Sequence, residues 1–286
     1  MDKLQQYKRE VDAFLASFLA SKQKDFTRVN PWGPDAIEKI RAIVSEGKTI
    51  RGSLVLLTHD ILHGTVHDDA LRVAAAYELI QTGLIIHDDI MDHDILRRGK
   101  PTLHIQYKSE ALAMCVGDIL FFLAEELLSG TNVQTISDQI FQEVGIAQMQ
   151  DVSFGLKKDF PTKEEIISLY TYKTARYTFS LPMMAGAILA RADRETINLL
   201  ENLGESMGIL FQIQNDALGS KGDDRENKKT LVRYYRHHAL PVQSTLQKDI
   251  ALYEARARRA LQSFNRRHFD TTTLSTLLSF VTNRKS

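Results

Sequence analysis

Four aspartates gather within the stretch LIIHDDIMDHDILRRGKPTLH, residues 84–104, directly after an apolar run. On a helix, Asp88 and Asp92 share one face because they are four residues apart, and Asp89 lies about 100° further round. Carboxylates this close repel one another, so one of them takes up a proton unless a cation joins them. Mg²⁺ is a suitable cation, since it prefers oxygen and often binds one or two carboxylates together with phosphate oxygens. The spacing therefore predicts a magnesium site at Asp88 and Asp92.

Three cations, Arg97, Arg98 and Lys100, follow within a few residues. Arginine binds phosphate in bidentate fashion, and lysine binds it as a point charge. Carboxylates and cations beside an apolar helix indicate a ligand with a diphosphate at one end and a hydrocarbon at the other. The alternative is a solvated helix end with local ion pairs, and the arginines at this distance from the apolar helix make it the weaker interpretation.

Long helices must position these residues, because apolar residues recur at helical spacing over most of the chain. The predicted segments are 4–21, 35–45, 47–64, 68–91, 109–128, 133–154, 163–189, 194–218 and 240–264. A loop is expected at 30–34, where two prolines flank Trp32 and Gly33, and Asp35 is expected to cap the helix that follows.

No alternating strand pattern, glycine-rich phosphate loop or flexible linker is visible in the sequence. We therefore predict an all-α fold with a single domain over residues 1–286. Several segments are apolar nearly all round, which is typical of helices inside a bundle. The expected architecture is a bundle of long antiparallel helices around a deep central cavity, with charged residues at the mouth of that cavity.

The composition excludes several classes of function. The chain has 286 residues with 36 basic and 36 acidic side chains, and this balance gives no indication of nucleic-acid or anionic-membrane binding. Its single cysteine, Cys115, excludes an internal disulfide and suits a reducing compartment. We expect no signal peptide, no membrane span and a cytoplasmic location.

Four stretches resemble motifs of the trans-prenyl diphosphate synthases, and they occur in the family's order. HDDIMDHDILRRGKPTLH (87–104) resembles the first aspartate-rich motif, and EGKTIRGSLVLL (46–57) resembles the family's GGKxxRP stretch. YKTARYTFSLPMMAGAIL (172–189) resembles the helix that contains Lys-Thr, and FQIQNDALGSKGDDRENKKT (211–230) resembles the FQxxDDxxD region. The ordered match spans most of the chain, which is far more specific than any one motif.

The resemblance implies an isoprenoid-synthase fold and a Mg²⁺-dependent prenyltransferase. Such an enzyme condenses isopentenyl diphosphate with an allylic diphosphate, and in this family three Mg²⁺ ions hold the allylic diphosphate between two acidic helices. The resemblance also implies a homodimer, for which the segment 109–128 is a candidate interface. Ordinary core packing of that segment is the alternative.

The resemblance also assigns roles to individual residues. Asp88 and Asp92 would ligate Mg²⁺, with Asp89 supporting them. The positions that bind isopentenyl diphosphate correspond to Lys48, Arg51 and Arg98, and those that hold the allylic diphosphate correspond to Arg97 and Lys173. Further substrate or catalytic contacts are expected from Gln81, Thr174, Gln212 and Lys221. Gln81 stands where many family members have a histidine.

The second acidic motif departs from the family pattern. Its three carboxylate positions hold Asn215, Asp216 and Gly219, so Asp216 is the one expected metal ligand and the third ion is in question. Asp223 or Asp224 could compensate. Two alternative functions follow: a class I terpene cyclase, whose metal motif has a similar spacing at 215, 219 and 223, and a non-catalytic subunit of a heteromeric synthase. The retained cations of the isopentenyl site argue against a cyclase, and the intact first motif argues against an inactive subunit.

Product length is expected to depend on Gly83 and Leu84, the residues five and four positions before Asp88. In the family these positions form the floor of the chain pocket. If Gly83 leaves space there, the product grows by at least one isoprene beyond farnesyl. We therefore expect geranylgeranyl diphosphate, with farnesyl diphosphate as the second choice, and expect Gly83→Phe to shorten the product.

Overall fold

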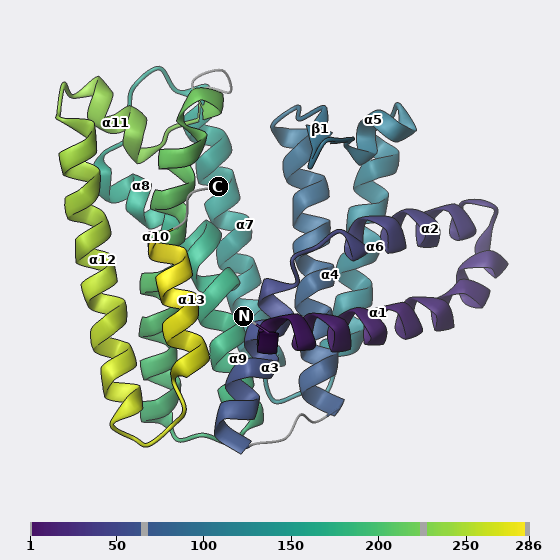
Figure 1. Ribbon diagram of the computed structural model, residues 1–286. Coiled ribbons are helices and arrows are strands. Elements are labelled where there is room, and N and C mark those ends of the chain that lie inside the picture. The colour runs from purple at the N-terminus through teal and green to yellow at the C-terminus, as the bar shows by residue number, and fades with distance from the viewer. Residues whose placement is uncertain (1, 64–67, 224–227, 284–286) are drawn as a thin grey trace. The chain divides into compact units, whose positions relative to one another are not determined.

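The computed structural model describes residues 2–63, 68–223 and 228–283, and almost all of its regular structure is helical (Figure 1). The prediction of an all-α fold is confirmed. The elements in chain order are α1 (Asp2–Val29), α2 (Trp32–Ser45), α3 (Ile50–His63), α4 (Asp68–Met91), β1 (Leu96–Arg97), β2 (Lys100–Pro101), α5 (Leu103–Tyr107), α6 (Glu110–Leu128), α7 (Gln134–Leu156), α8 (Lys163–Leu169), η1 (Tyr170–Ser180), α9 (Leu181–Leu189), α10 (Arg194–Asp223), α11 (Leu231–His237), α12 (Val242–Asn265) and α13 (Thr272–Thr282).

The chain forms two compact units. The first, here called the N-terminal unit, contains Asp2–Leu57 and Thr65–Thr131. The second, the C-terminal unit, contains Thr58–Gly64 and Asn132–Ser286 together with Met1. Helix α3 thus contributes its first half to one unit and its second half to the other, and the single domain stays a prediction.

In the N-terminal unit, α1 and α2 form a helical hairpin with a shorter turn than the sequence predicted. Helix α2 already begins at Trp32, because proline is tolerated in the first turn of a helix, where its missing N–H has no partner to lose. A side-chain carbon on Gly33 would overlap the backbone of Phe26, so only glycine permits this close turn. Asp35 lies in the first turn and accepts a hydrogen bond from the hydroxyl of Tyr107, which means that the predicted cap at Asp35 is wrong.

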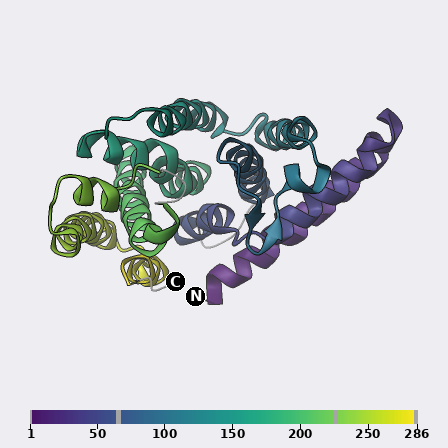
Figure 2. The same cartoon turned by 90° about the horizontal axis from the view of Figure 1, so that it is seen from above.

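Helices α4 and α6 run side by side in both views of the N-terminal unit (Figures 1 and 2). Helix α6 begins where the sequence predicted, with Ser109 Oγ accepting from the backbone N–H of Leu112 at 3.3 Å. A side chain on Gly117 of α6 would overlap the ring of His87, so this glycine lets the acidic end of α4 approach α6 closely. His87 Nε2 lies 3.3 Å from the carbonyl oxygen of Met114.

A hairpin with two residues in each strand follows the acidic end of α4. The sequence did not predict these strands. Residues Leu96 and Pro101 pair, as do Arg97 and Lys100. The two turn residues both have positive φ, 54° at Arg98 and 78° at Gly99. Such a turn matches the twist of the flanking strands and favours glycine, which explains the glycine that follows the two arginines.

In the C-terminal unit, α10 packs against η1, α9, α12 and α13. The predicted helix 163–189 is continuous but changes its winding, since Tyr170–Ser180 forms a π-helix between α8 and α9. Lys173 and Thr174 lie on this π-helical segment, and π-helical turns are frequent at functional sites. Gly204 and Gly208 of α10 face the backbone of Ser180 and Ala175, so the two elements lie unusually close.

Short helices were the main omission of the sequence-based prediction. Helices α5, α11 and α13 have 5, 7 and 11 residues, too few for a clear apolar period. Helix α11 is instead marked by its cap, since Thr230 Oγ1 accepts from the backbone N–H of Arg233 at 3.4 Å. Within the described ranges, no helix combines the length and apolar character needed to cross a bilayer.

We predict that Gly208→Ala lowers the free energy of unfolding by about 1–3 kcal/mol, because the added methyl group overlaps Ala175 of η1. Denaturant unfolding followed by circular dichroism measures this change. Gly145→Ala in α7 is the matched control, since nothing lies within 4 Å of its added carbon. That control should stabilise the helix by about 0.5–1 kcal/mol. Equal effects of the two substitutions would contradict the close packing of α10 on η1.

Candidate active site

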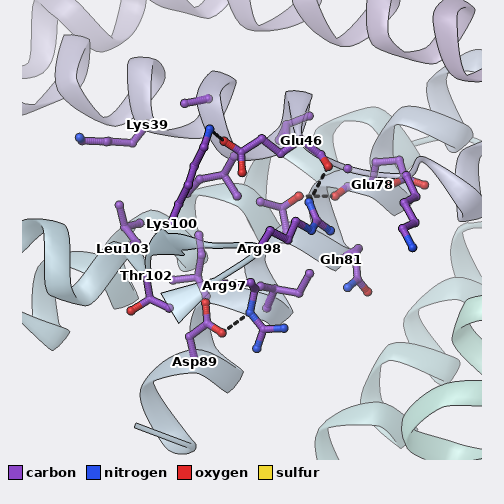
Figure 3. Close-up of a pocket in the computed structure, with 18 of the residues that line it drawn as sticks. Lys39, Glu46, Glu78, Gln81, Asp89, Arg97, Arg98, Lys100, Thr102 and Leu103 are labelled. Atoms are coloured by element: carbon purple, nitrogen blue, oxygen red, sulfur yellow. Dashed lines mark hydrogen bonds and ion pairs between the residues drawn. The ribbon is translucent and has the colours of Figure 1, made fainter. Parts of the chain in front are cut away.

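A pocket of about 370 Å³ opens in the N-terminal unit beside the acidic helix α4 (Figure 3). Residues of α2, α4, α5, the hairpin and the loop 46–49 line it, along with the first turn of α3. Six cationic side chains line the pocket: Lys39, Lys48, Arg51, Arg97, Arg98 and Lys100. Four carboxylates also line it, those of Glu38, Glu46, Glu78 and Asp89. The cations outnumber them, so the pocket is suited to an anionic ligand such as a diphosphate.

Five of the predicted substrate-binding residues line this one pocket. They are Lys48, Arg51, Gln81, Arg97 and Arg98. They come from three separate parts of the sequence, and only Arg97 and Arg98 are neighbours in the chain. The pocket also contains Lys100, the third cation that the sequence indicated for phosphate binding, and Lys39, which the sequence did not indicate. Lys173 and Gln212, which were also assigned to substrate binding, belong to the C-terminal unit.

Asp89 holds Arg97 at the edge of the pocket. Its carboxylate accepts a hydrogen bond from Nε of Arg97, while Nη2 of the same arginine lies 3.1 Å from Asp94. Asp89 is buried, and burial raises the pKa of its carboxyl to about 6, although Arg97 acts in the opposite direction. Asp89 is therefore occupied by Arg97, which agrees with a supporting role rather than with direct metal ligation.

Glu46 connects the hairpin to the loop before α3. Its backbone carbonyl accepts from Nη1 of Arg98 at 2.6 Å, and its carboxylate lies 2.5 Å from Nζ of Lys100. Glu46 occupies the first glycine position of the GGKxxRP pattern. Its carboxylate offsets one of the pocket's cations, and its carbonyl fixes the direction of Arg98 (Figure 3).

Asp88 and Asp92 lie one turn apart at the end of α4, where the N–H of Asp92 donates to the carbonyl of Asp88 at 2.8 Å. Both residues are half-buried. Two neighbouring carboxylates at the end of a helix fit Mg²⁺, which takes its other oxygens from water and phosphate. In the described ranges, no three His, Cys, Asp or Glu side chains form a complete ligand set.

The remaining predicted catalytic residues lie in the C-terminal unit. Thr174 Oγ1 is 3.5 Å from Oε1 of Gln212, which brings η1 and α10 together at this point. Lys173, on the same π-helical segment, forms an ion pair with Asp151 of α7. This ion pair joins η1 to α7.

Asp216 is enclosed by hydrogen-bond donors. One of its oxygens accepts from the hydroxyl of Tyr170 and, at 3.2 Å, from the backbone N–H of Leu231. The other accepts from Nε2 of Gln212 at 3.1 Å, and the side chain is only 2% exposed. Asp216 does not fit the role of metal ligand that its place in the motif suggested, because it already joins η1, α10 and α11.

The side chains of Lys221 and Asp223 lie outside the described part of the structure, as does all of Asp224. Asn215 and Gly219 provide no carboxylate. Among the described side chains, the second motif therefore does not fit the usual third-ion site.

Gly83 faces α6 rather than an open pocket. A side-chain carbon built on Gly83 would lie 2.6 Å from the ring of Phe121 and 3.0 Å from the carbonyl oxygen of Gly117. The expectation that Gly83 leaves space for a growing chain is wrong, because Phe121 occupies that space. Leu84 is half-buried on the neighbouring face of α4, and its role in product length stays a prediction.

The sequence did not indicate which residues form hydrogen bonds or ion pairs with the predicted site residues. Glu46, Asp151 and Tyr170 each contact a predicted site residue that lies 22 to 54 positions away in the chain. No periodicity or local spacing connects such residues, so a single sequence carried no signal that would have paired them.

The chain is similar to known proteins over most of its length. Residues 35–240 match a family model described as polyprenyl synthetase. A short chain isoprenyl diphosphate synthase of Methanocaldococcus jannaschii is 34% identical over 204 residues, which are 65% of this chain and 61% of that protein. A farnesyl diphosphate synthase of Bacillus subtilis is 31% identical over 237 residues, covering 74% of this chain and 78% of that protein. The chain thus spans about three fifths of the length of the first of these relatives.

The fold is also found in solved structures. A geranylgeranyl pyrophosphate synthase of Corynebacterium glutamicum, complexed with isoprenyl diphosphate and magnesium, superposes with a TM-score of 0.82. The superposition covers 99% of each chain at 22% sequence identity, so this likeness concerns the fold.

We predict that Gly83→Phe lowers the free energy of unfolding by about 1–3 kcal/mol, because the new ring and Phe121 cannot share the contact between α4 and α6. Thermal unfolding measures the loss. The double variant Gly83→Phe with Phe121→Ala should recover much of the lost stability, since it returns one ring to the same space. A fully stable Gly83→Phe protein would show that the glycine faces open space after all.

Proposed function

Since this chain belongs to the polyprenyl synthetase family, we propose that it condenses isopentenyl diphosphate with an allylic diphosphate to give a short-chain trans-prenyl diphosphate. The observation that carries this proposal is the cationic pocket of the N-terminal unit, which adjoins the half-buried carboxylates at the end of α4. An anion site next to a metal site is the combination that a two-substrate diphosphate reaction requires.

The cationic pocket is the proposed site of isopentenyl diphosphate. Lys48, Arg51 and Arg98 supply the charges for its diphosphate, and Gln81 supplies a neutral polar contact. A terpene cyclase ionises a single diphosphate and has no use for this second anion site. The pocket therefore favours a condensing enzyme over a cyclase.

Asp88 and Asp92 are the proposed ligands of divalent metal, and Mg²⁺ fits their oxygen chemistry. Bound there, Mg²⁺ would supply charge stabilisation to the departing diphosphate of the allylic substrate. The Corynebacterium glutamicum synthase with bound magnesium supports divalent metal use in this fold. We assign no step to a third ion, because Asn215, Asp216 and Gly219 do not fit one.

The chain's own groups have three tasks in the proposed reaction. Arg97 holds the allylic diphosphate as its C–O bond breaks. The side-chain oxygens of Thr174 and Gln212 stabilise the allylic carbocation while the double bond of isopentenyl diphosphate attacks it. A proton is then lost to the released diphosphate. Apolar helix faces exclude water, which would otherwise quench the cation.

Geranylgeranyl diphosphate is the proposed product, with farnesyl diphosphate as the second choice. The chain is similar to a geranylgeranyl diphosphate synthase and also to a farnesyl diphosphate synthase. Gly83 no longer supports the longer product, because its space is filled by Phe121, so Leu84 is the remaining candidate determinant.

A homodimer is the proposed assembly. On α6, Met114 is 42% exposed and Phe122 is 75% exposed. On α7, Ile146, Met149 and Leu156 are 69%, 73% and 82% exposed. Large apolar side chains exposed at this frequency on one helix are typical of an interface between subunits.

The decisive experiment incubates the purified protein with Mg²⁺, labelled isopentenyl diphosphate and one allylic primer: dimethylallyl, geranyl or farnesyl diphosphate. Longer labelled chains that retain a diphosphate are the expected result. Release of diphosphate without consumption of isopentenyl diphosphate would identify a cyclase instead. Absence of turnover, with binding of a homologous synthase chain, would identify a non-catalytic subunit.

We predict that Asp88→Ala abolishes turnover while the protein stays folded, because the substitution removes a metal ligand and also relieves carboxylate repulsion. Asp69→Ala at the other end of α4 is the matched control and should keep full activity, since Asp69 pairs with Arg72 at the surface. Chelation by EDTA should stop the wild-type reaction, and added Mg²⁺ should restore it. Activity that survives both Asp88→Ala and EDTA would exclude the metal site proposed here.

A further inference from the structure

The loop that carries Lys48 has a strained backbone next to that lysine. Thr49 adopts a left-handed conformation with φ of 53°. For a β-branched residue this conformation is unfavourable, and it persists only where the surroundings hold it in place. Thr49 is buried and begins α3, since its carbonyl accepts from the N–H of Ser53 at 3.0 Å. Contacts from other elements must therefore hold this loop in place.

Lys8 of α1 supplies the fixing contacts. Its Nζ donates to the carbonyl of Gly47 at 2.8 Å and to Oγ1 of Thr49 at 3.2 Å, and it lies 2.8 Å from Oδ2 of Asp12. An ammonium group has three N–H donors, and these three acceptors account for all of them. The hydroxyl of Thr49 in turn donates to Oδ1 of Asp12 at 3.2 Å. The two residues on either side of Lys48 are thus held by one Lys–Asp pair.

Glu78 of α4 holds the same segment from the other side. It is buried at 7% exposure, and its Oε1 accepts from the backbone N–H of Gly52 at 2.8 Å. Burial raises the pKa of Glu78, whereas the charge of Arg51 and the N–H groups of Gly52 and Arg51 act against this increase. A carboxylate at the N-terminus of α3 satisfies N–H groups that the helix itself leaves unpaired.

We infer that Lys8, Asp12 and Glu78 are positioning residues for isopentenyl diphosphate: they hold the backbone of 47–52 in the shape that aims Lys48 and Arg51 into the cationic pocket. This inference rests on the function proposed above. None of the three needs to touch the substrate. A Lys–Asp pair four residues apart on a helix adds little to the stability of that helix, so its contacts with the loop are the larger part of its effect.

A preformed anion site lowers the KM of its ligand, because the ordering cost is met before binding. Loss of the contact should therefore act on one substrate only. For Lys8→Met we expect the KM of isopentenyl diphosphate to rise about tenfold, the size of effect expected when charge-assisted hydrogen bonds are lost. The kcat and the KM of the allylic substrate should stay within about twofold. Lys8→Arg should recover most of the loss, since it keeps a charged donor.

Lys22→Met is the matched control, because Lys22 is also on α1 and also pairs with another helix, through Glu126 of α6. It should leave both KM values unchanged. Equal KM changes in Lys8→Met and Lys22→Met would overturn the inference. So would a parallel rise of both KM values in Lys8→Met with a lowered unfolding temperature, since that result would indicate a general structural role.

Asp12→Asn covers the case in which Lys8→Met does not fold, because asparagine keeps the acceptor for Thr49 and loses only the charge. Calorimetric titration with isopentenyl diphosphate in Mg²⁺-free buffer gives a second measurement that needs no turnover. A wild-type protein that binds but does not consume isopentenyl diphosphate would refute the proposed function and leave the inference testable by this titration. Wild-type-like affinity of Asp12→Asn and Lys8→Met in the titration would refute the inference alone.

Discussion

Mutual repulsion among like charges is the constraint on which the N-terminal unit depends. A pocket for a diphosphate must hold several cations near one another before the ligand arrives, and a metal site must hold carboxylates close together in the same way. Burial makes each repulsion stronger, because the surroundings screen it less than water does. The structure meets this constraint by giving the charged groups partners: Asp89 for Arg97, the carbonyl and carboxylate of Glu46 for Arg98 and Lys100, and Glu78 near Arg51.

These partners also fix direction. An arginine that already donates to a backbone carbonyl has lost much of the rotamer freedom it would otherwise lose on binding. The backbone has positive φ at two places beside these charged residues. One is the turn of the hairpin, at Arg98 and Gly99, and the other is Thr49. Local strain next to the charged residues is thus balanced by hydrogen bonds from α1 and α4.

In the C-terminal unit, the carboxylate of the second acidic motif is bound by hydrogen-bond donors of the protein itself. Asp216 joins three elements through hydrogen bonds from Tyr170, Gln212 and Leu231, whereas the flanking motif positions hold asparagine and glycine. A carboxylate that is enclosed by donors stabilises the packing of η1, α10 and α11 but has little capacity left for a metal. The first motif has two half-buried carboxylates one turn apart, whereas the carboxylate of Asp216 in the second motif connects elements of its own unit.

The sequence by itself determined the helical class, most of the long helices and five of the residues that line the cationic pocket. It could do so because helical periodicity and motif spacing are local properties of the chain. It could not determine that Gly83 faces Phe121, that the second motif's aspartate is enclosed, or that Lys8 and Glu78 hold the loop around Lys48. Each of these depends on contacts between residues that are 26 to 46 positions apart or come from different helices, and such contacts are decided only when the helices pack. Tertiary packing alone also revealed the π-helical winding of Tyr170–Ser180, since its sequence has the apolar spacing of an ordinary helix.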